Sequence, residues 1–208
     1  MDKQEIAREL GQSGARELLE SATLARLAYN GLDGLPRVIP IAFYWTGECV
    51  VVCTATTSPK VRALSARPDV AITIDTGDTP AAARSLLVRG VASVETVDGV
   101  AEEYLEAAKK AMDPDSHAAF EGAVRSMYKQ QVRVAIEPRW ARFYDFGAGR
   151  VPAFLAKLAA STRELAPGQL NAGPMTSSGV PVIAVLRSDS GVNSGRPATL
   201  SNFRRGLA

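Results

Sequence analysis

Hydroxyl side chains and a lysine surround a predicted helix start, and this group is the strongest chemical signal in the sequence. The run TATTSPKVRAL, residues 54–64, follows a strand-like segment. Ser58 can cap a helix and Pro59 suits its first turn, so free amides and the helix dipole favour an anion in front of them. Lys60 adds a positive charge. The hydroxyl donors are Thr54, Thr57 and Ser58. This pattern indicates a phosphate site, and an ordinary capped helix with a solvated lysine is the alternative.

Arg37 is the second candidate, because it begins a strand-like segment, PRVIPIAFYW, that is otherwise almost wholly apolar. A planar guanidinium suits bidentate phosphate binding, although an arginine at the rim of a barrel is the alternative. Pro40 cannot donate to a sheet ladder, so it marks an edge or a bulge. Such an edge leaves room for a ligand ring beside the strand, or it simply protects the strand from pairing.

The sequence lacks a catalytic constellation of side chains. It has no Gly-x-Ser-x-Gly elbow, no Walker loop and no Gly-x-Gly-x-x-Gly after a strand. His117 is its one histidine, which we expect on the solvated surface and which leaves little room for a triad or a metal site. Cys49 and Cys53 lie on one predicted strand about 13 Å apart, too far for a disulfide. We expect no catalytic side chain and no metal, so if the chain is an enzyme, a cofactor carries the difficult chemistry.

Composition places the chain among soluble globular proteins. It has 208 residues, of which 46% are hydrophobic, and this suits one domain with a real core. A net charge of +2 argues against a nucleic-acid-binding protein. Because no apolar run reaches 18 residues and the N-terminus does not resemble a signal peptide, we expect no membrane association and a cytoplasmic location.

Strands dominate the predicted elements. Helices are expected over residues 3–20, interrupted at Gly11 and Gly14, over 58–66, twice between 100 and 128, and once more in VPAFLAKLAA. The predicted strands are residues 23–29, 37–45, 48–54, 69–75, 85–97, 132–137 and 140–146. Since strands and helices do not alternate, we predict a mostly β (α+β) fold: a six- to seven-stranded antiparallel split β-barrel with flanking helices.

Two features divide the chain further. The segment 37–45 is apolar on both faces, so one face can fill a barrel while the other needs a cover, for which a partner subunit is a natural candidate. The C-terminal stretch is rich in Gly, Pro, Ser and Asn. We therefore predict a barrel domain over residues 1–162 and an irregular tail over 163–208.

Three segments carry a family resemblance: LARLAYNGLDGLPRVIPIAFYW, VVCTATTSPKVRALSARPDVAITID and LLVRGVASV. Their order and spacing resemble the pyridoxamine 5′-phosphate oxidase-like family, the FMN-binding split barrels, over about residues 20–146. The resemblance implies a six-stranded antiparallel split barrel. It also implies a homodimer with two cofactors at the subunit interface.

The resemblance also implies a set of cofactor-binding residues. The strand along the flavin would contribute Val38, Ile39, Pro40 and Ile41. The segment from Ser58 to Lys60 would hold the phosphate, with Pro59 where family members often have an arginine or lysine. Trp140 matches an aromatic position that approaches the cofactor of the other subunit in some members, and a core or interface tryptophan is the alternative.

These expectations point to a flavin-dependent oxidoreductase that uses FMN and a small-molecule redox substrate. The chain lacks the C-terminal arginine and histidine pattern of the true oxidase, so the resemblance implies no particular substrate. Two alternatives remain open. One is a reductase that uses the deazaflavin coenzyme F-420, and the other is a flavin-binding protein without turnover.

Overall fold

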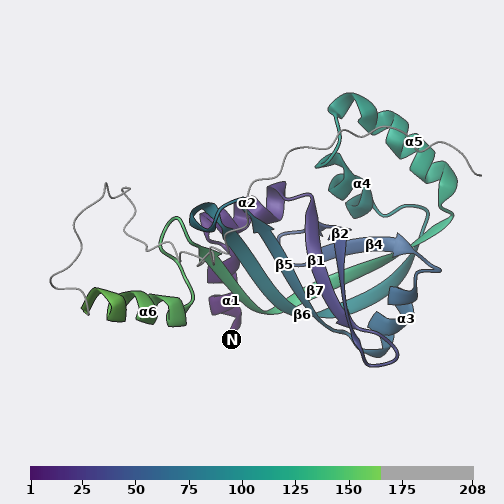
Figure 1. Ribbon diagram of the computed structural model, residues 1–208. Helices are drawn as coiled ribbons and strands as arrows, with labels where there is room; N and C mark the ends of the chain where they lie inside the picture. Colours follow the sequence, from purple (N-terminus) through teal and green to yellow (C-terminus); the bar gives the residue numbers. More distant parts are fainter. Residues whose placement is uncertain (165–208) are drawn as a thin grey trace, which may run out of the picture.

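The computed structural model describes residues 1–164, so residues 165–208 of the predicted tail lie outside the described part of the chain. Within that part, seven strands form one sheet (Figure 1). They are β1 (Leu24–Asn30), β2 (Pro36–Ala42), β3 (Tyr44–Trp45), β4 (Val50–Ala55), β5 (Asp69–Thr76), β6 (Arg84–Asp98) and β7 (Gln130–Asp145). The helices are α1 (Lys3–Leu10), α2 (Ser13–Ser21), α3 (Pro59–Ala66), α4 (Glu102–Lys109), α5 (His117–Met127) and α6 (Ala153–Glu164).

The sheet is an open, curled barrel. Its strand order is β2-β1-β5-β6-β7-β4-β3, and every pairing is antiparallel. The two ends of this order, β2 and β3, are consecutive in the chain and are separated only by the buried Phe43. The sheet must therefore curl until its ends meet, while β2 and β4 contact each other without a hydrogen-bonded ladder. This arrangement is the predicted split barrel.

The observed strands differ from the predicted ones in two places. The segment 37–45 divides at Phe43, because its first part pairs with β1 and its second with β4. The segments 132–137 and 140–146 form one strand, β7. A β-bulge lets Pro138 remain within this strand: Gly90 pairs with Pro138 and Arg89 with Trp140, so Arg139 has no partner on β6. Gly90 is required there, since a Cβ atom would lie 2.5 Å from the Glu137 carbonyl oxygen.

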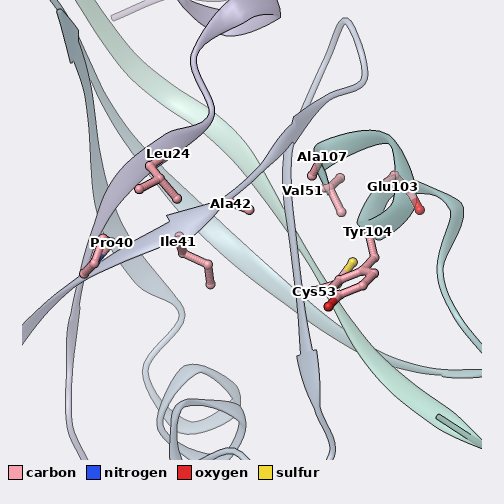
Figure 2. Close-up of a pocket in the computed structure, with 9 residues that line it drawn as sticks. All are labelled: Leu24, Pro40, Ile41, Ala42, Val51, Cys53, Glu103, Tyr104 and Ala107. Atoms are coloured by element: carbon pink, nitrogen blue, oxygen red, sulfur yellow. The ribbon is translucent and has the colours of Figure 1, made fainter. Parts of the chain in front are cut away.

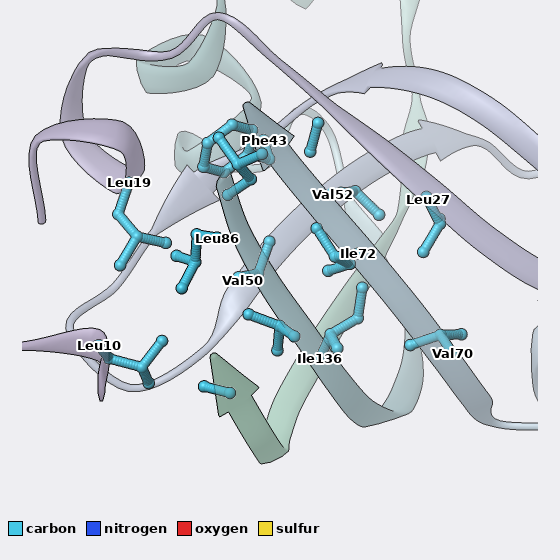
Figure 3. Packing of buried hydrophobic residues seen from close by; sticks show 14 of the residues in the cluster. Leu10, Leu19, Leu27, Phe43, Val50, Val52, Val70, Ile72, Leu86 and Ile136 are labelled. Carbon is cyan, nitrogen blue, oxygen red and sulfur yellow. The ribbon is translucent and has the colours of Figure 1, made fainter. Parts of the chain in front are cut away.

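The hydrophobic core fills the barrel interior (Figure 3). Alternate residues of the strands point inward, as the period of two dictates. The two N-terminal helices close one end of the barrel with Leu10, Leu18 and Leu19. Inward-facing residues of the strands include Leu27, Val50, Val52, Ile72, Leu86, Val134 and Ile136.

The predicted break at Gly11 is confirmed, because α1 ends before Gly11 and α2 begins at Ser13. The predicted break at Gly14 is wrong, since Gly14 lies inside α2, where it is packed so closely on the Phe143 ring that a Cβ atom would lie 2.5 Å from it. One buried carboxylate fixes α1 to the end of the barrel. Glu9 accepts hydrogen bonds from the Phe143 amide at 2.9 Å and from the Arg150 guanidinium at 2.6 Å, and it lies 3.2 Å from Arg142.

The segment between β6 and β7 forms a helical insertion, α4 and α5, outside the barrel (Figure 1). It has its own small apolar cluster of Val100, Leu105 and Val124, with three aromatic rings packed against it. The inner helix, α4, contacts β2, β3 and β4. The insertion therefore lies over the place where the barrel is split.

His117 differs from the expected solvated histidine. It is half-buried at the start of α5, and its Nε2 atom has no hydrogen-bond partner among the described residues. In the same part of the chain no helix is long and apolar enough to cross a membrane, and no three potential metal ligands gather.

Candidate functional site

The candidate site is the seam between the edges of β2 and β4. The chain runs along β2, passes Phe43 into β3, and returns along β4, so β2 and β4 run in opposite directions. The start of β2, with Arg37, therefore lies at the same end of the seam as the end of β4, with Thr54. The end of β2, with Ala42, lies at the other end of the seam, together with the start of β4. Each end of the seam has its own chemistry.

A cationic group occupies the end of the seam beside α3. The Lys60 ammonium donates hydrogen bonds to the hydroxyl oxygens of Thr54 at 3.0 Å and Ser58 at 2.9 Å. Lys60 is half-buried, and this burial lowers the pKa of its ammonium. No carboxylate in the described part of the chain forms an ion pair with it.

The α3 helix adds one unpaired backbone donor, the Lys60 amide, to this group. It begins at Pro59, which has no N–H, while the Ser58 and Val61 amides donate to carbonyl oxygens at 3.0 Å. The Ser58 side chain makes no capping hydrogen bond and the first turn contains no acidic residue, so the Lys60 amide and the helix dipole attract an anion. Thr57 lies exposed just before the helix. A partly dehydrated cation, one free amide and hydroxyls together make an arrangement that can bind phosphate.

Arg37 is engaged elsewhere in this structure. Its guanidinium donates to the Asp33 carboxylate at 2.7 Å and to the Leu35 carbonyl at 3.1 Å. The Arg37 hydrogen bond is the main cause that lowers the pKa of Asp33. Arg37 thus lies at the end of β2 that faces the Lys60 group, but no hydrogen bond joins it to Lys60 or to the hydroxyl partners of Lys60.

A mostly apolar cavity of about 330 Å³ lies at the other end of the seam (Figure 2). Strands β1 and β2 form one side, and β4 with α4 forms the other. The lining residues are Leu24, Pro40, Ile41, Ala42, Val51, Cys53, Glu103, Tyr104 and Ala107. On β2, Ile39 and Ile41 pack on the core while Val38 and Pro40 face outward. The predicted flavin strand therefore borders both the cavity and an exposed sheet face.

Polar groups of the cavity come from α4. The Glu103 carboxylate forms an ion pair with Arg133 at 2.8 Å. Burial alone would raise the pKa of Glu103, but Arg133 outweighs it and holds this pKa below its usual range. Burial, reinforced by Tyr128 and Cys53, raises the pKa of Tyr104. Sequence analysis singled out neither residue, because it predicted only helices between residues 100 and 128.

Trp140 lies on β7 beyond the residues, Gln131–Ile136, that pair with the β4 edge of the seam. It faces outward on β7, where the guanidinium carbon of Arg89 lies 4.6 Å from its ring centroid. Strand register places Val38, Ala28, Ala71, Arg89 and Trp140 in one row across five strands, which we call the outer row. Four strand spacings, roughly 19 Å along the sheet, separate Trp140 from Val38.

A family model described as pyridoxamine 5′-phosphate oxidase matches residues 12–141. The chain belongs to the pyridoxamine 5′-phosphate oxidase-like family. This membership covers the sheet up to the middle of β7, together with the helices that border the seam. A comparison with curated proteins gave no match.

Several solved structures are similar to this member of the family. A conserved hypothetical protein from Mycobacterium tuberculosis has 23% identity and a TM-score of 0.51, over 73% of this chain and 89% of that one. An F420 reductase has 27% identity and a TM-score of 0.48, over 61% of this chain and 94% of that one. The heme storage protein HutZ from Vibrio cholerae has 17% identity and a TM-score of 0.46, over 64% and 93%. The first of these supports the split-barrel fold.

Proposed function

We propose that this chain is a flavin-dependent oxidoreductase that binds FMN along the seam, at the interface of a homodimer, and acts on a small-molecule redox substrate. The observation that carries the proposal is the Lys60 group at the start of α3. It supplies an anion site at one end of a seam whose other end is an apolar cavity. FMN has a matching shape, with a phosphate at one end and a flat ring at the other.

The residues present fit such a cofactor. Lys60 is partly dehydrated and lacks a carboxylate partner among the described residues, so a phosphate would satisfy both its ammonium and its free backbone amide at the start of α3. The Thr54 and Ser58 hydroxyls, which now accept from Lys60, can rotate to donate to phosphate oxygens. Arg37 can join them by leaving its exposed partners, the Asp33 carboxylate and the Leu35 carbonyl.

The chain would then bind, orient and shield the cofactor. When bound, the flavin ring supplies the hydride transfer. The free edge of β2 offers backbone groups from Val38 to Ile41, of which Pro40 can only accept. Apolar side chains of the cavity exclude water from the ring. This mechanism needs no acid or base from the protein.

A second copy of the chain completes the proposed site. The outer row begins at Val38, which is 65% exposed, and Leu24 at the start of β1 is 53% exposed, so apolar side chains are uncovered on the outer face of β1 and β2 in one protomer, with the Arg26–Asp75 ion pair between them. Trp140 belongs to the same face, four strands away from Val38. A twofold partner can present its Trp140 to this seam.

The anchor is tested by comparing FMN with riboflavin, which lacks the phosphate. Lys60→Ala should weaken FMN binding by about ten- to a hundredfold, since a charge-assisted contact is worth roughly 1.5–3 kcal/mol. Lys157→Ala, at an exposed position on α6, is the matched control and should have no effect. Equal affinities of the unmodified protein for FMN and riboflavin would refute the phosphate anchor.

Two further measurements identify the cofactor and the reaction. The absorption spectrum and mass of the co-purifying molecule distinguish FMN from the deazaflavin coenzyme F-420. Anaerobic NAD(P)H should bleach a bound flavin, and a substrate or dye should restore its colour. A flavin that is never reduced would indicate a binding protein without turnover.

A further inference from the structure

We propose that Tyr104 of α4 lies in contact with the ring of the bound cofactor, so that the α4–α5 insertion forms a wall of the ring site. This inference rests on the proposed function and deepens it. It assigns a role to a helix that the sheet-based site does not include. Tyr104 would act as a positioning residue and as an electron-rich side chain against the ring.

The position of Tyr104 in the cavity supports this role. Its side chain points from α4 toward Cys53 on β4, across the cavity from Pro40 and Ile41 on β2 (Figure 2). The β2 residues are those expected to run along the flavin. A flat ring that follows β2 from the Lys60 group into this cavity meets the phenol on the opposite side.

Neighbouring aromatic rings orient the Tyr104 phenol but leave its hydroxyl group free. Its ring stacks on Phe120 with centroids 6.2 Å apart, and it meets Tyr128 edge-on at 6.3 Å. No residue in the described part of the chain makes a hydrogen bond to the Tyr104 hydroxyl. The hydroxyl therefore stays available at the cavity, while the ring is held in a fixed plane.

The α4 helix is also held at both ends. At its start, Glu103 pairs with Arg133 on β7, and the Ala101 amide donates to the buried Gln131 side chain at 3.2 Å. After its end, the Lys110 ammonium donates to the Leu19 carbonyl at 3.0 Å and lies 4.2 Å from the centroid of the Phe43 ring. The wall is therefore preorganised, so little ordering opposes ring binding.

The test is a fluorescence titration of the full-length apoprotein with FMN. A tyrosine in contact with an excited flavin quenches it by electron donation, whereas phenylalanine and leucine do not. Tyr104→Phe keeps the aromatic packing, so FMN should bind with similar affinity but with brighter bound-state emission. Tyr104→Leu also loses ring contact and should weaken FMN binding about fivefold, within the range expected for one aromatic pair.

Tyr128 provides the matched control, because it contacts Tyr104 within the same cluster but does not line the cavity. Tyr128→Phe should leave both emission and affinity unchanged. If the unmodified protein binds FMN through Lys60 but both Tyr104 variants behave like it, the wall assignment is wrong and the proposed function stands. If the unmodified protein binds no FMN, the proposed function fails and this inference fails with it.

Discussion

The Cys53 thiol lies under Tyr104 and is poorly placed to ionise. Burial is the main cause that raises its pKa to about 12, Glu103 adds to the rise, and Arg133 opposes it. Only the thiolate reacts with alkylating agents, and at pH 8 roughly one such thiol in ten thousand is ionised. We expect iodoacetamide to modify Cys53 slowly at pH 8, with a rate that still rises at pH 10, as measured by peptide mass spectrometry. A rate that levels off below pH 9 would contradict this prediction, and urea-unfolded protein is the fast-reacting control.

Asp33 holds Arg37 away from the proposed phosphate. Their ion pair is about half exposed, and such pairs contribute about 0–1 kcal/mol, so its loss is a small obstacle to binding. Asp33→Asn removes both this competitor and a negative charge. We predict FMN binding that is tighter by up to about fivefold, measured by calorimetry. Arg37→Ala should instead weaken it, and tighter binding in Arg37→Ala would show that this arginine does not contact the phosphate.

Site residues were predictable from sequence where they are neighbours in the chain. Thr54, Ser58 and Lys60 lie within seven consecutive residues, so a strand end and a helix start bring them together locally. Tyr104 lies far along the chain and reaches the cavity only through the packing of α4 on β4. No periodicity separates such a tyrosine from an ordinary core residue.

At the scale of elements, the attachment of α1 should depend on pH. Burial alone would raise the pKa of Glu9, but the Phe143 amide and the Arg150 and Arg142 guanidinium groups outweigh it and lower this pKa below 4.5. Stability from this carboxylate is present above the pKa of an unfolded glutamate and is lost as the pH falls through the lower folded value. We predict a steep loss of thermal stability below about pH 4.5.

Glu9→Gln tests that prediction. The amide oxygen can still accept from Phe143, but the charge is lost, so the variant should be less stable at pH 7 by about 2 kcal/mol. Its unfolding temperature should also fall less steeply as the pH is lowered toward 3, a part of the pH profile that we call the acid limb. Unfolding temperatures between pH 3 and 7 measure both effects. Glu20→Gln, at an exposed position on α2, is the control and should keep the steep limb. An unchanged acid limb in Glu9→Gln would show that other carboxylates control it.

Most elements could be predicted because their signals are local. Gly11 separates α1 from α2, and Pro59 begins α3, as the sequence indicates. The breaks inside long strands could not be predicted in this way. Phe43 interrupts β2–β3 because the two halves pair with different strands, and Pro138 stays within β7 because a bulge absorbs it. Both features depend on partners distant in sequence.

At the scale of the whole molecule, the proposed dimer interface over the outer row would explain why β2 is apolar on both faces. Ile39 and Ile41 pack on the core, while Val38 and Pro40 face outward. A monomer would leave this outward face in water. Cofactor binding and assembly should therefore be coupled, since the β2 residues that border the cavity also border the uncovered face.

Val38→Asp tests this coupling. Val38 is 65% exposed in one protomer, so an aspartate there should not disturb the fold, but burying it without a partner in an interface would cost several kcal/mol. We predict that the unmodified protein has about twice its 22.0 kDa chain mass by light scattering and that the variant falls toward a single chain. Met127→Asp on α5 changes a side chain that is 70% exposed and lies off the outer row, so it should leave the dimer intact.

The same Val38→Asp variant should bind FMN more weakly when its dimer dissociates, because the partner's Trp140 would then leave the proposed seam. A Val38→Asp protein that stays dimeric would place the interface on another face, and a monomer with undiminished FMN affinity would show that one protomer holds the complete site.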